Sequence, residues 1–502
     1  MRVGASLLLT VMSLGLLLRK SFASLSLAFI QATGKTRFLS IFREIKNQAF
    51  SSPVSRQRYR TALLSELFKR AEETTFLGER FEGVRVAEGN TQDDDVFGLL
   101  RMLQPIGKGE LARRFPEGVL TKDRFDKRSI QNTSGTTGDR LSVVTNFPKR
   151  ETARASTMYM LDIATNRSLG LALVDIPPNV CNTVCGLEGP PVTGWLELVS
   201  KGIKKKELFK PGFRSDANGL FERRVVLRQD VLAPLDARSP SDLLVQLEST
   251  WRSLDKLRPE LLRAFPQYLL WISQFVLKTK IKPLGLKFAM PYGGLASGSL
   301  LEQVRESLGV QTRNAYGTSE LGPLAVSCDE QTAMHVNEHL FELEIMREGQ
   351  SVNDGDVGEI VVTDFTNTAM PLIRYKVGDV GRFVRGECRC GRTTRRIEVL
   401  GRLQETIQLE DRWITPASIA EIAYSDRGVG NFRVDEIGAN QYELQIAASL
   451  NDRLPDVELI KKKFSELFER PIRVSHRIVP YIQPEPNGKF LTCRLRSFRR
   501  NG

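Results

Sequence analysis

Histidine and cysteine are scarce in this chain, which has three histidines and six cysteines among 502 residues. Small secreted proteins that depend on disulfides carry far more cysteine for their length, so that class is excluded. Long apolar runs are scarce as well. Residues 3–18 are uncharged and largely apolar, but this stretch is shorter than the roughly 20 residues that a membrane-spanning helix needs.

The N-terminal segment has mixed signals. Arg2 precedes the apolar stretch and small residues follow it, as in a secretory signal. However, Arg19 and Lys20 stand directly after the stretch, and a second apolar segment follows at residues 25–30. This order argues against export. We therefore expect a cytoplasmic protein whose residues 3–30 form a helix that packs on the main domain or makes a peripheral contact with a membrane.

The composition is that of a globular protein, with 41% hydrophobic and 26% charged residues. The length predicts two or more domains. A net charge of +13 raises the question of a nucleic acid partner. Acidic residues are interspersed with the basic ones, and no aromatic-rich basic segment is evident, so we expect no nucleic acid. A basic surface also suits an enzyme that attracts anionic nucleotides.

The hydrophobic patterning predicts an α/β protein in which a large N-terminal domain of mixed sheets and helices is followed by a small, mobile α+β domain. Residues 299–308 show the spacing of an amphipathic helix, and residues 341–345 alternate as in a half-buried strand. Smaller units restart at residue 401. The predicted parts are a helical extension at 1–58, the main domain at 59–400, a hinge at 401–405 and a C-terminal lid domain at 406–502.

One loop is suited to phosphate. Residues Thr133–Gly138 contain three hydroxyl side chains and two glycines, and none of them is charged or bulky. Glycines allow backbone N–H groups to converge on an anion, and the hydroxyls add donors. The loop does not end in Gly-Lys-Ser/Thr, and no Gly-x-Gly-x-x-Gly follows a predicted strand, so neither common nucleotide motif is present.

Five further segments follow this loop in order. They are Tyr292–Gly294, Asn314–Glu320, Arg374–Asp379, Gly401–Glu405 and Pro486–Lys489. In this order and at this spacing the segments resemble those of the acyl-adenylate-forming enzymes, also called the AMP-binding superfamily. The closest branch is similar to the phenylacetate–CoA ligase and CapK group. The resemblance covers residues 60 to 495 approximately, and it implies an ATP-dependent enzyme with a mobile C-terminal lid.

The resemblance also implies a role for each residue type. When an acid and ATP form an acyl adenylate, negative charge grows at the α-phosphate, so positioned donors and cations matter more than a nucleophile. Lys489 would place its ammonium at the bridging oxygen, Ser319 would reach the α-phosphate, and Glu320 would hold Mg²⁺. The nucleotide-binding residues that the resemblance implies are Ser134, Gly135, Thr136, Thr137, Gly138, Gly293, Gly294, Tyr316, Gly317, Asp379 (at the ribose) and Arg402.

Three positions depart from the family pattern. Gln404 stands in the hinge where the family has Asp or Lys, and residues 410–413 lack the usual Arg-Gly pair near the route of the thiol. Asp139 and Arg140 replace the usual continuation of the phosphate loop. The first two departures bear on the second half-reaction, in which the acyl group is transferred.

Four soft ligands form two pairs, Cys328 with His335 and Cys388 with Cys390. Three thiolates and one imidazole are the ligand set of a closed structural zinc site, and some phenylacetate-ligase-like proteins carry a similar arrangement. Residues 335–339 also match His-x-x-Glu-His, a zinc-peptidase motif that requires a helix. This segment runs into an alternating strand, so a peptidase is not expected. Cys181, Cys185 and Cys493 are left unassigned.

The sequence thus predicts a ligase that uses ATP to activate a carboxylic acid, with an aryl or aryl-acetic acid as the first expectation, and that transfers the acyl group to CoA. Two alternatives stay open: transfer to a carrier protein or another amine or hydroxyl, and a non-catalytic nucleotide-binding scaffold. The implied cofactors are ATP, Mg²⁺, CoA and structural Zn²⁺. A homodimer also stays open.

Overall fold

The computed structural model describes residues 37–87, 96–122, 129–132, 141–166, 171–178, 228–282, 285–330, 333–485 and 488–496. The apolar segment at 3–30 and the phosphate loop Thr133–Gly138 lie outside the described residues, as do Asp139, Arg140, Cys181 and Cys185. The predicted α/β class is confirmed, with helices and several sheets in one chain.

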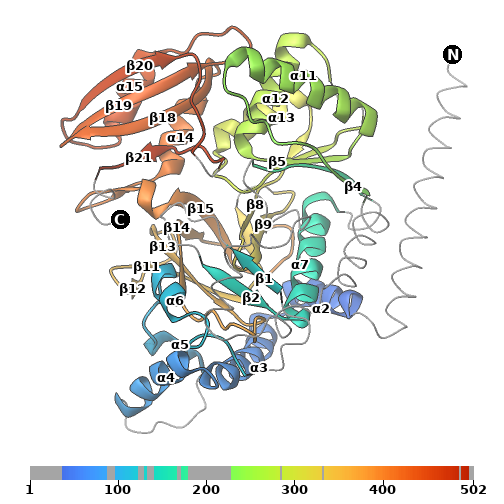
Figure 1. The fold of residues 1–502 in the computed structure, drawn as a ribbon, viewed down its shortest axis with the longest axis vertical. Helices are drawn as coiled ribbons and strands as arrows, with labels where there is room; N and C mark the ends of the chain where they lie inside the picture. Colours follow the sequence, from blue (N-terminus) through green and yellow to red (C-terminus); the bar gives the residue numbers. More distant parts are fainter. Residues whose placement is uncertain are drawn as a thin grey trace, which may run out of the picture.

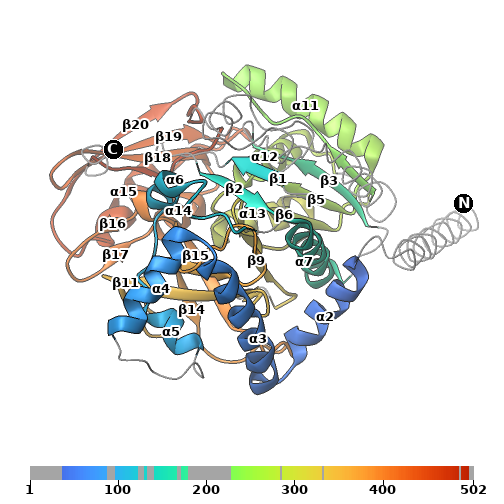
Figure 2. The same ribbon diagram turned by 60° about the horizontal axis from the view of Figure 1, so that its bottom comes forward.

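The first described part is helical. Ser52 caps helix α3 by accepting a hydrogen bond from the backbone of Ser55, and Pro53 stands at the first helical position, where its fixed φ suits the turn. Figure 1 shows α2 to α5, in blue, at the end of the molecule away from the C-terminal domain, and Figure 2 shows the same helices in a turned view. Their bounds are α2 (Phe38–Phe50), α3 (Pro53–Glu72), α4 (Thr75–Ala87), α5 (Val96–Met102) and α6 (Lys108–Arg114).

A parallel five-stranded sheet forms the next layer, in the order β4-β3-β5-β6-β7. Its strands are short, and the three central ones, β3, β5 and β6, are mostly buried, as expected when helices cover a parallel sheet. The strands are β3 (Ala172–Ile176), β4 (Arg228–Val231), β5 (Leu261–Ala264), β6 (Phe288–Pro291) and β7 (Gln311–Thr312), and the helices of this part are α7 (Phe147–Thr165), α11 (Pro240–Leu257), α12 (Pro266–Thr279) and α13 (Gly298–Leu308). The hairpin β1 (Ser129–Asn132) and β2 (Ser142–Thr145) precedes α7.

An antiparallel eight-stranded sheet follows, in the order β12-β11-β13-β14-β15-β10-β9-β8. The alternation predicted at residues 341–345 falls in β11, where Phe341, Leu343 and Ile345 are buried and Glu342 and Glu344 are partly exposed. The strands are β8 (Ala315–Thr318), β9 (Gly322–Ser327), β10 (Met334–Val336), β11 (Phe341–Arg347), β12 (Gln350–Ser351), β13 (Gly358–Asp364), β14 (Tyr375–Val384) and β15 (Arg396–Arg402).

The C-terminal part has a four-stranded sheet in the order β20-β19-β18-β21. A short 3₁₀ turn, η2 (Leu403–Glu405), connects it to β15. Its elements are β16 (Ile407–Gln408), β17 (Trp413–Ile414), α14 (Pro416–Ser425), β18 (Val429–Gly438), β19 (Gln441–Ala448), α15 (Val457–Glu466), β20 (Arg473–Val479) and β21 (Cys493–Arg494). Figure 1 shows this sheet, in orange and red, beside α11–α13.

The C-terminal part packs firmly on the parallel-sheet part. One continuous apolar core contains Leu269 and Ile272 of α12 together with Phe432 of β18. Buried glutamines add polar contacts. The Nε2 of Gln274 donates to the Val429 carbonyl at 3.0 Å, and the Nε2 of Gln303 donates to the Tyr424 carbonyl at 2.6 Å. The orientation of the C-terminal part is therefore fixed by both apolar burial and buried hydrogen bonds.

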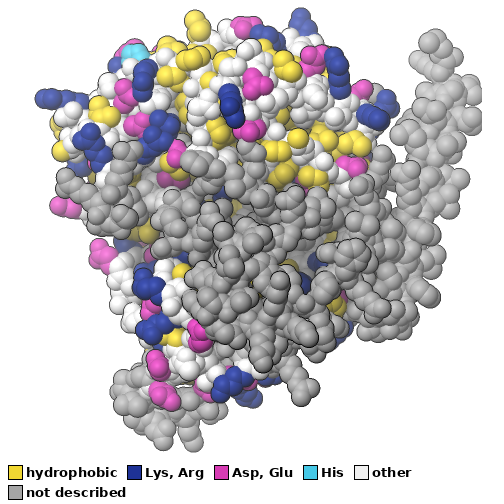
Figure 3. All heavy atoms as spheres, viewed as in Figure 1, with side chains coloured by type: hydrophobic (Ala, Val, Ile, Leu, Met, Phe, Trp, Pro, Cys, Tyr) yellow, Lys and Arg dark blue, Asp and Glu magenta, His cyan; other side chains and the backbone are white. Residues whose placement is uncertain are grey.

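In the part of the chain that the structure describes, no helix combines the length and the hydropathy needed to cross a membrane. On the face drawn in Figure 3, the Lys and Arg side chains of the described residues are interspersed with acidic and neutral ones.

Candidate functional site

Strand β8 and the turn that follows it carry four of the predicted site residues, two expected to bind nucleotide and two expected to be catalytic. Tyr316 and Gly317 lie in β8, and Ser319 and Glu320 form the turn that follows. A Cβ at Gly317 would stand 2.6 Å from the Gly322 carbonyl oxygen, so the tight pairing of β8 with β9 requires glycine here. The backbone pairing thus holds a tyrosine, a hydroxyl and a carboxylate within five consecutive residues.

Tyr316 reaches across the sheet to Asp379 of β14. Its hydroxyl donates to the Asp379 Oδ2 at 2.8 Å, and the Nε of Arg402 pairs with the Oδ1 at 3.2 Å. Burial, followed by the charge of Asp379, raises the pKa of Tyr316, so the phenol remains a donor. Each carboxylate oxygen accepts one donor from the protein and retains capacity for another. A carboxylate held in this way can accept from two vicinal hydroxyls.

Glu320 lies next to this network. Its Oε2 accepts from the Ser319 hydroxyl at 3.1 Å, and its Oε1 accepts from the Tyr375 hydroxyl at 3.4 Å. The Nζ of Lys108, at the start of α6, lies 4.0 Å from the Oε1. Burial, followed by the charge of Glu320, raises the pKa of Tyr375 and keeps that hydroxyl protonated. Sequence reasoning missed Lys108, which belongs to none of the matched motifs; Tyr375 lies inside a quoted motif but had no assigned role.

Gly293 and Gly294 follow β6 at the carboxyl end of the parallel sheet, where ligands of such sheets bind. A Cβ at Gly294 would stand 2.6 Å from the Phe265 ring, so glycine is required for this close approach. The Phe265 ring lies 6.2 Å from that of Phe490, centroid to centroid. Phe490 directly follows Lys489. The structure therefore brings the segment that carries Lys489 to the edge of the Gly293–Gly294 loop.

The predicted hinge begins at the end of β15 and continues through η2. Glu405 is only 7% exposed, and its Oε2 accepts from the backbone N–H groups of Thr492 at 2.8 Å and Cys493 at 3.4 Å. Burial raises the pKa of Glu405 to about 7, although these N–H groups and the guanidinium of Arg402 oppose the rise. The hinge thus contacts Asp379 through Arg402 and the segment after Lys489 through Glu405.

The predicted metal ligands come together. The candidate ligand atoms of Cys328, His335, Cys388 and Cys390 all lie within 4.8 Å of one another. The Sγ atoms of Cys328 and Cys388 are 3.6 Å apart, and the Sγ of Cys390 lies 3.2 Å from the Nε2 of His335. The sulfur separation is far above the roughly 2.05 Å of a disulfide and is close to that of two thiolates on one tetrahedral metal.

The surroundings suit a neutral imidazole ligand. The Nδ1 of His335 lies 3.2 Å from the Thr394 hydroxyl, which leaves the Nε2 directed at the sulfurs. Burial lowers the pKa of His335 to about 4, and burial raises the pKa of the Cys328 thiol to about 12. Metal binding would therefore displace thiol protons but none from the histidine.

The loop that carries Cys388 and Cys390 also anchors the first helices. Next to it, the Thr393 hydroxyl donates to the Ser51 carbonyl at 2.7 Å, and the Nη1 of Arg56 donates to the Thr393 hydroxyl at 2.7 Å. These contacts tie the junction of α2 and α3 to the turn between β14 and β15. A metal at this point would stabilise the attachment of the N-terminal helices to the eight-stranded sheet.

The His-x-x-Glu-His match does not form a peptidase site. His335 lies in β10, and the following residues form a turn into β11 rather than a helix. Burial lowers the pKa of His339 to about 3, and its ring packs edge-on against Tyr159. The segment is not helical, as expected, but it turns at residues 337–340 instead of remaining extended.

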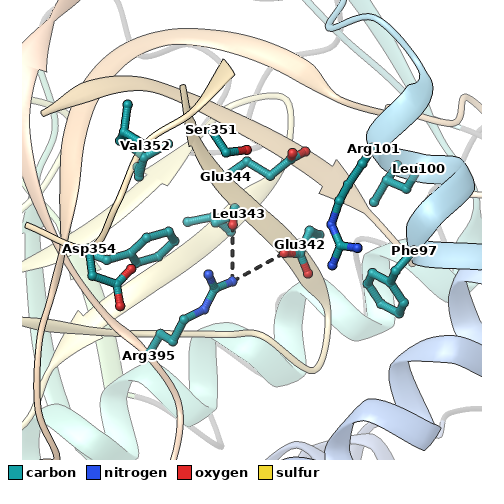
Figure 4. Close-up of a pocket in the computed structure, with 12 residues that line it drawn as sticks. Phe97, Leu100, Arg101, Glu342, Leu343, Glu344, Ser351, Val352, Asp354 and Arg395 are labelled. Carbon is teal, nitrogen blue, oxygen red and sulfur yellow. Dashed lines mark hydrogen bonds and ion pairs between the residues drawn. The ribbon is translucent and has the colours of Figure 1, made fainter. Parts of the chain in front are cut away.

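A separate cavity of about 190 Å³ lies between α5 and β11 (Figure 4). Its charged lining is engaged within the protein. Arg395 donates to the Glu342 carboxylate at 3.4 Å and to the Leu343 carbonyl at 3.2 Å, and the Arg374 guanidinium pairs with Glu344 at 2.7 Å. None of the predicted nucleotide or metal residues is among the described residues that line it.

The sequence comparisons identify distant relatives. No family model matches the chain. The phenylacetate–coenzyme A ligase of Thermus thermophilus is 31% identical over 173 residues, which are 33% of this chain and 39% of that protein. Protein CapK of Staphylococcus aureus is 25% identical over 130 residues, which are 26% of this chain and 27% of that protein. The chain thus matches well under half the length of these relatives.

The structural comparison covers nearly the whole chain. A 2-hydroxyisobutyryl-CoA ligase in its postadenylation state matches with a TM-score of 0.66 at 16% identity, over 91% of this chain and 93% of that one. The same ligase in its thioesterification state gives 0.54. The chain is a distant homologue of the phenylacetate–CoA ligases and CapK, and it has the fold of the adenylate-forming CoA ligases.

Proposed function

We propose that this protein is an ATP-dependent, AMP-forming ligase that activates a carboxylic acid as an acyl adenylate and transfers the acyl group to CoA. The observation that carries the proposal is the joined network of Tyr316, Asp379 and Arg402 beside Ser319 and Glu320. These residues come from three motifs that are far apart in the sequence. A structural requirement alone does not explain why a tyrosine, two carboxylates and a guanidinium gather at one place on the eight-stranded sheet.

In the proposed reaction, Asp379 accepts from both ribose hydroxyls, and Arg402 and Tyr316 hold its carboxylate in place. Ser319 donates to the α-phosphate. Glu320 would hold Mg²⁺, which neutralises phosphate charge as pyrophosphate leaves. The support for Lys489 is the packing of Phe490 on Phe265, which keeps the lysine segment at the nucleotide side.

The acid substrate is proposed from the relatives alone. Since the curated relatives include phenylacetate–coenzyme A ligases, an aryl or aryl-acetic acid is the first candidate. The test is a panel of aryl, aryl-acetic and short hydroxy acids, assayed by pyrophosphate release and by hydroxamate trapping of the adenylate. Stimulation by one acid class supports the proposal. ATP binding without release on any acid would instead support a nucleotide-binding scaffold.

A second candidate transfers the acyl group to a carrier protein or to another amine or hydroxyl. Two features favour this candidate. Gln404 replaces the usual hinge residue, and the Arg412 guanidinium is engaged in ion pairs with Asp411 at 2.7 Å and with Glu469. The nearby cation is thus engaged within the lid. Supplying CoA after the adenylate has accumulated separates the two candidates, because an acyl-CoA product appears only with the first.

We further propose that Cys328, His335, Cys388 and Cys390 bind a structural zinc ion. Their donor atoms fit one tetrahedral ion, and the Thr394 hydroxyl holds the imidazole in place. The bound metal would join the end of β9 to the turn between β14 and β15. Metal analysis of the purified protein tests this directly, with about one zinc per chain as the expected value.

A further inference from the structure

A second, larger cavity lies between the C-terminal sheet and helices α11 and α12. Figure 1 shows that sheet beside the two helices. Its volume is about 520 Å³, within the range of small-molecule sites, which is roughly 300–1,000 Å³. The apolar walls are formed by Leu243 and Leu244 of α11, by Trp271 of α12, and by residues 478–481 at the end of β20 and directly after it. The described lining residues include none of those proposed to hold nucleotide or metal.

The sheet supplies a polar group to this cavity. Asn431 of β18 pairs with Ala447 of β19, which pairs with Val479 of β20, so the three side chains share one face. All three residues line the cavity. The adjacent residue, Phe432, points to the other face, where its ring packs against Tyr424. The Asn431 side chain therefore faces the cavity.

The amide of Asn431 has an unused donor. The residue is 3% exposed, and its Oδ1 accepts from the backbone N–H of Phe432 at 2.8 Å. This bond fixes which end of the amide is the NH₂ group. Among the described residues, no acceptor bonds that Nδ2, and the Tyr481 hydroxyl in the same cavity also has no partner. Unpaired buried polar atoms are few in native proteins and each costs free energy, so two in one cavity point to a missing acceptor.

The cavity offers no net charge. Lys278 and Asp452 both line it, and they pair with each other at 2.8 Å. The neighbouring carbonyl of Gly430 already accepts from the Nε2 of Gln267 at 2.6 Å. Burial raises the pKa of Tyr481, so its hydroxyl stays protonated and can donate. An ionic ligand would have no counter-charge here, whereas a carbonyl oxygen is a suitable acceptor for either donor.

We propose that this cavity binds a neutral, mainly apolar small molecule whose carbonyl oxygen accepts from Asn431 and Tyr481, with its apolar part against Trp271 and Leu244. The ligand would contact α11 and α12 on one side and the C-terminal sheet on the other. Its binding would therefore stabilise the arrangement of the two parts that the structure adopts. The described residues that line the site include none of those proposed for the adenylation reaction.

Benzophenone is a suitable probe, because it is a neutral aromatic ketone that bonds covalently to nearby C–H groups on irradiation. Irradiation of the full chain with benzophenone should label peptides that contain residues 240–244 or 478–481. The labelling should saturate as the benzophenone concentration is raised. Excess ATP should not reduce the labelling. Labelling that ATP removes, or labelling at other surfaces only, would overturn the proposal, since the ketone would then bind elsewhere.

Diphenylmethane provides the matched ligand, because it has the same rings without the carbonyl. At a higher concentration, diphenylmethane should protect the protein from labelling by benzophenone. Asn431→Leu should weaken benzophenone binding about tenfold, as expected when a buried carbonyl loses its donor, and should leave diphenylmethane protection unchanged. Equal effects on both ligands, or no effect on either, would contradict the carbonyl assignment.

A cavity-filling variant tests the location without touching the polar group. Leu244→Trp should abolish labelling, because the indole occupies the apolar end of the cavity. Val245→Trp is the matched control: the residue is on the same helix but is 68% exposed and does not line the cavity, so labelling should persist. Circular dichroism and thermal midpoints of both variants establish that they fold. Persistent labelling of a folded Leu244→Trp protein would overturn the site.

Discussion

Replacing Glu405 by glutamine tests how the hinge carboxylate affects stability. Burial raises the pKa of Glu405 from 4.5 to about 7 in the folded protein. The folded state therefore holds this proton more tightly than the unfolded state does. The resulting stabilisation is fully present below the unfolded pKa and is lost as the pH rises through the folded pKa. Glutamine retains an oxygen that can accept from Thr492, but it has no charge to desolvate.

The magnitude follows from the shift. One pKa unit corresponds to about 1.4 kcal/mol, so between pH 5 and pH 8 the buried carboxylate lowers the free energy of unfolding by roughly 2 to 3 kcal/mol. Urea denaturation at a series of pH values gives the free energy of unfolding of Glu405→Gln and of the parent. From pH 5 to pH 8 the difference between the two should shift by roughly 2 to 3 kcal/mol in favour of the variant. Other groups with shifted pKa values, such as His335 and His339, are shared and cancel.

Glu410→Gln is the matched control, because it removes an exposed carboxylate a few residues along the chain. Its difference from the parent should stay constant with pH. If the Glu405→Gln difference were also constant from pH 5 to pH 8, the carboxylate would not be held in the buried environment described here. A change of opposite sign would mean that Arg402 and the two backbone N–H groups outweigh the burial.

Three further substitutions test the site. Lys489→Ala should abolish adenylate formation in the hydroxamate assay with little loss of ATP affinity, and unchanged adenylation would refute its role. Asp379→Asn should weaken ATP binding at least tenfold in calorimetry, because the ribose hydroxyls and Arg402 both lose the charge, whereas equal affinity would exclude a ribose contact. Cys328→Ser should lose zinc in metal analysis and lower the thermal midpoint, while Cys493→Ser, in a buried strand away from the cluster, should retain the metal.

The elements with clear periodicity were predictable from the sequence. The amphipathic pattern at residues 299–308 matches α13 (Gly298–Leu308), and the alternation at 341–345 falls in β11. In both cases one face of the element is apolar and is buried, so the local pattern and the tertiary packing agree. The grouping of the three cysteines with His335 was also predictable, because thiolates and imidazole in pairs are a specific signal.

The docking of the C-terminal part was not predictable in the same way. Gln267, Gln274 and Gln303 lie on helices and look like solvent-facing residues in the sequence, yet each is buried and donates to a carbonyl of the C-terminal part. A hydrophobic pattern identifies which face is buried but not which polar residue finds a partner there. The contact of Lys108 with Glu320 is hidden for the same reason, since it joins segments some two hundred residues apart.

This interface bears on which acyl acceptor the proposed ligase would use. If the lid rotates for thioester formation, as in the family that the chain resembles, the hydrogen bonds of these glutamines must be exchanged for bonds to water. Each such exchange costs only about 0.5–1.5 kcal/mol, whereas the apolar core that α12 shares with β18 must also be exposed. The rim ion pair of Lys278 with Asp452 adds little because Asp452 is exposed. Rotation is therefore opposed mainly by the apolar contact. Binding of the acceptor must supply the compensating free energy, and an acceptor with a large contact surface, such as CoA or a carrier protein, can do so more readily than a small amine.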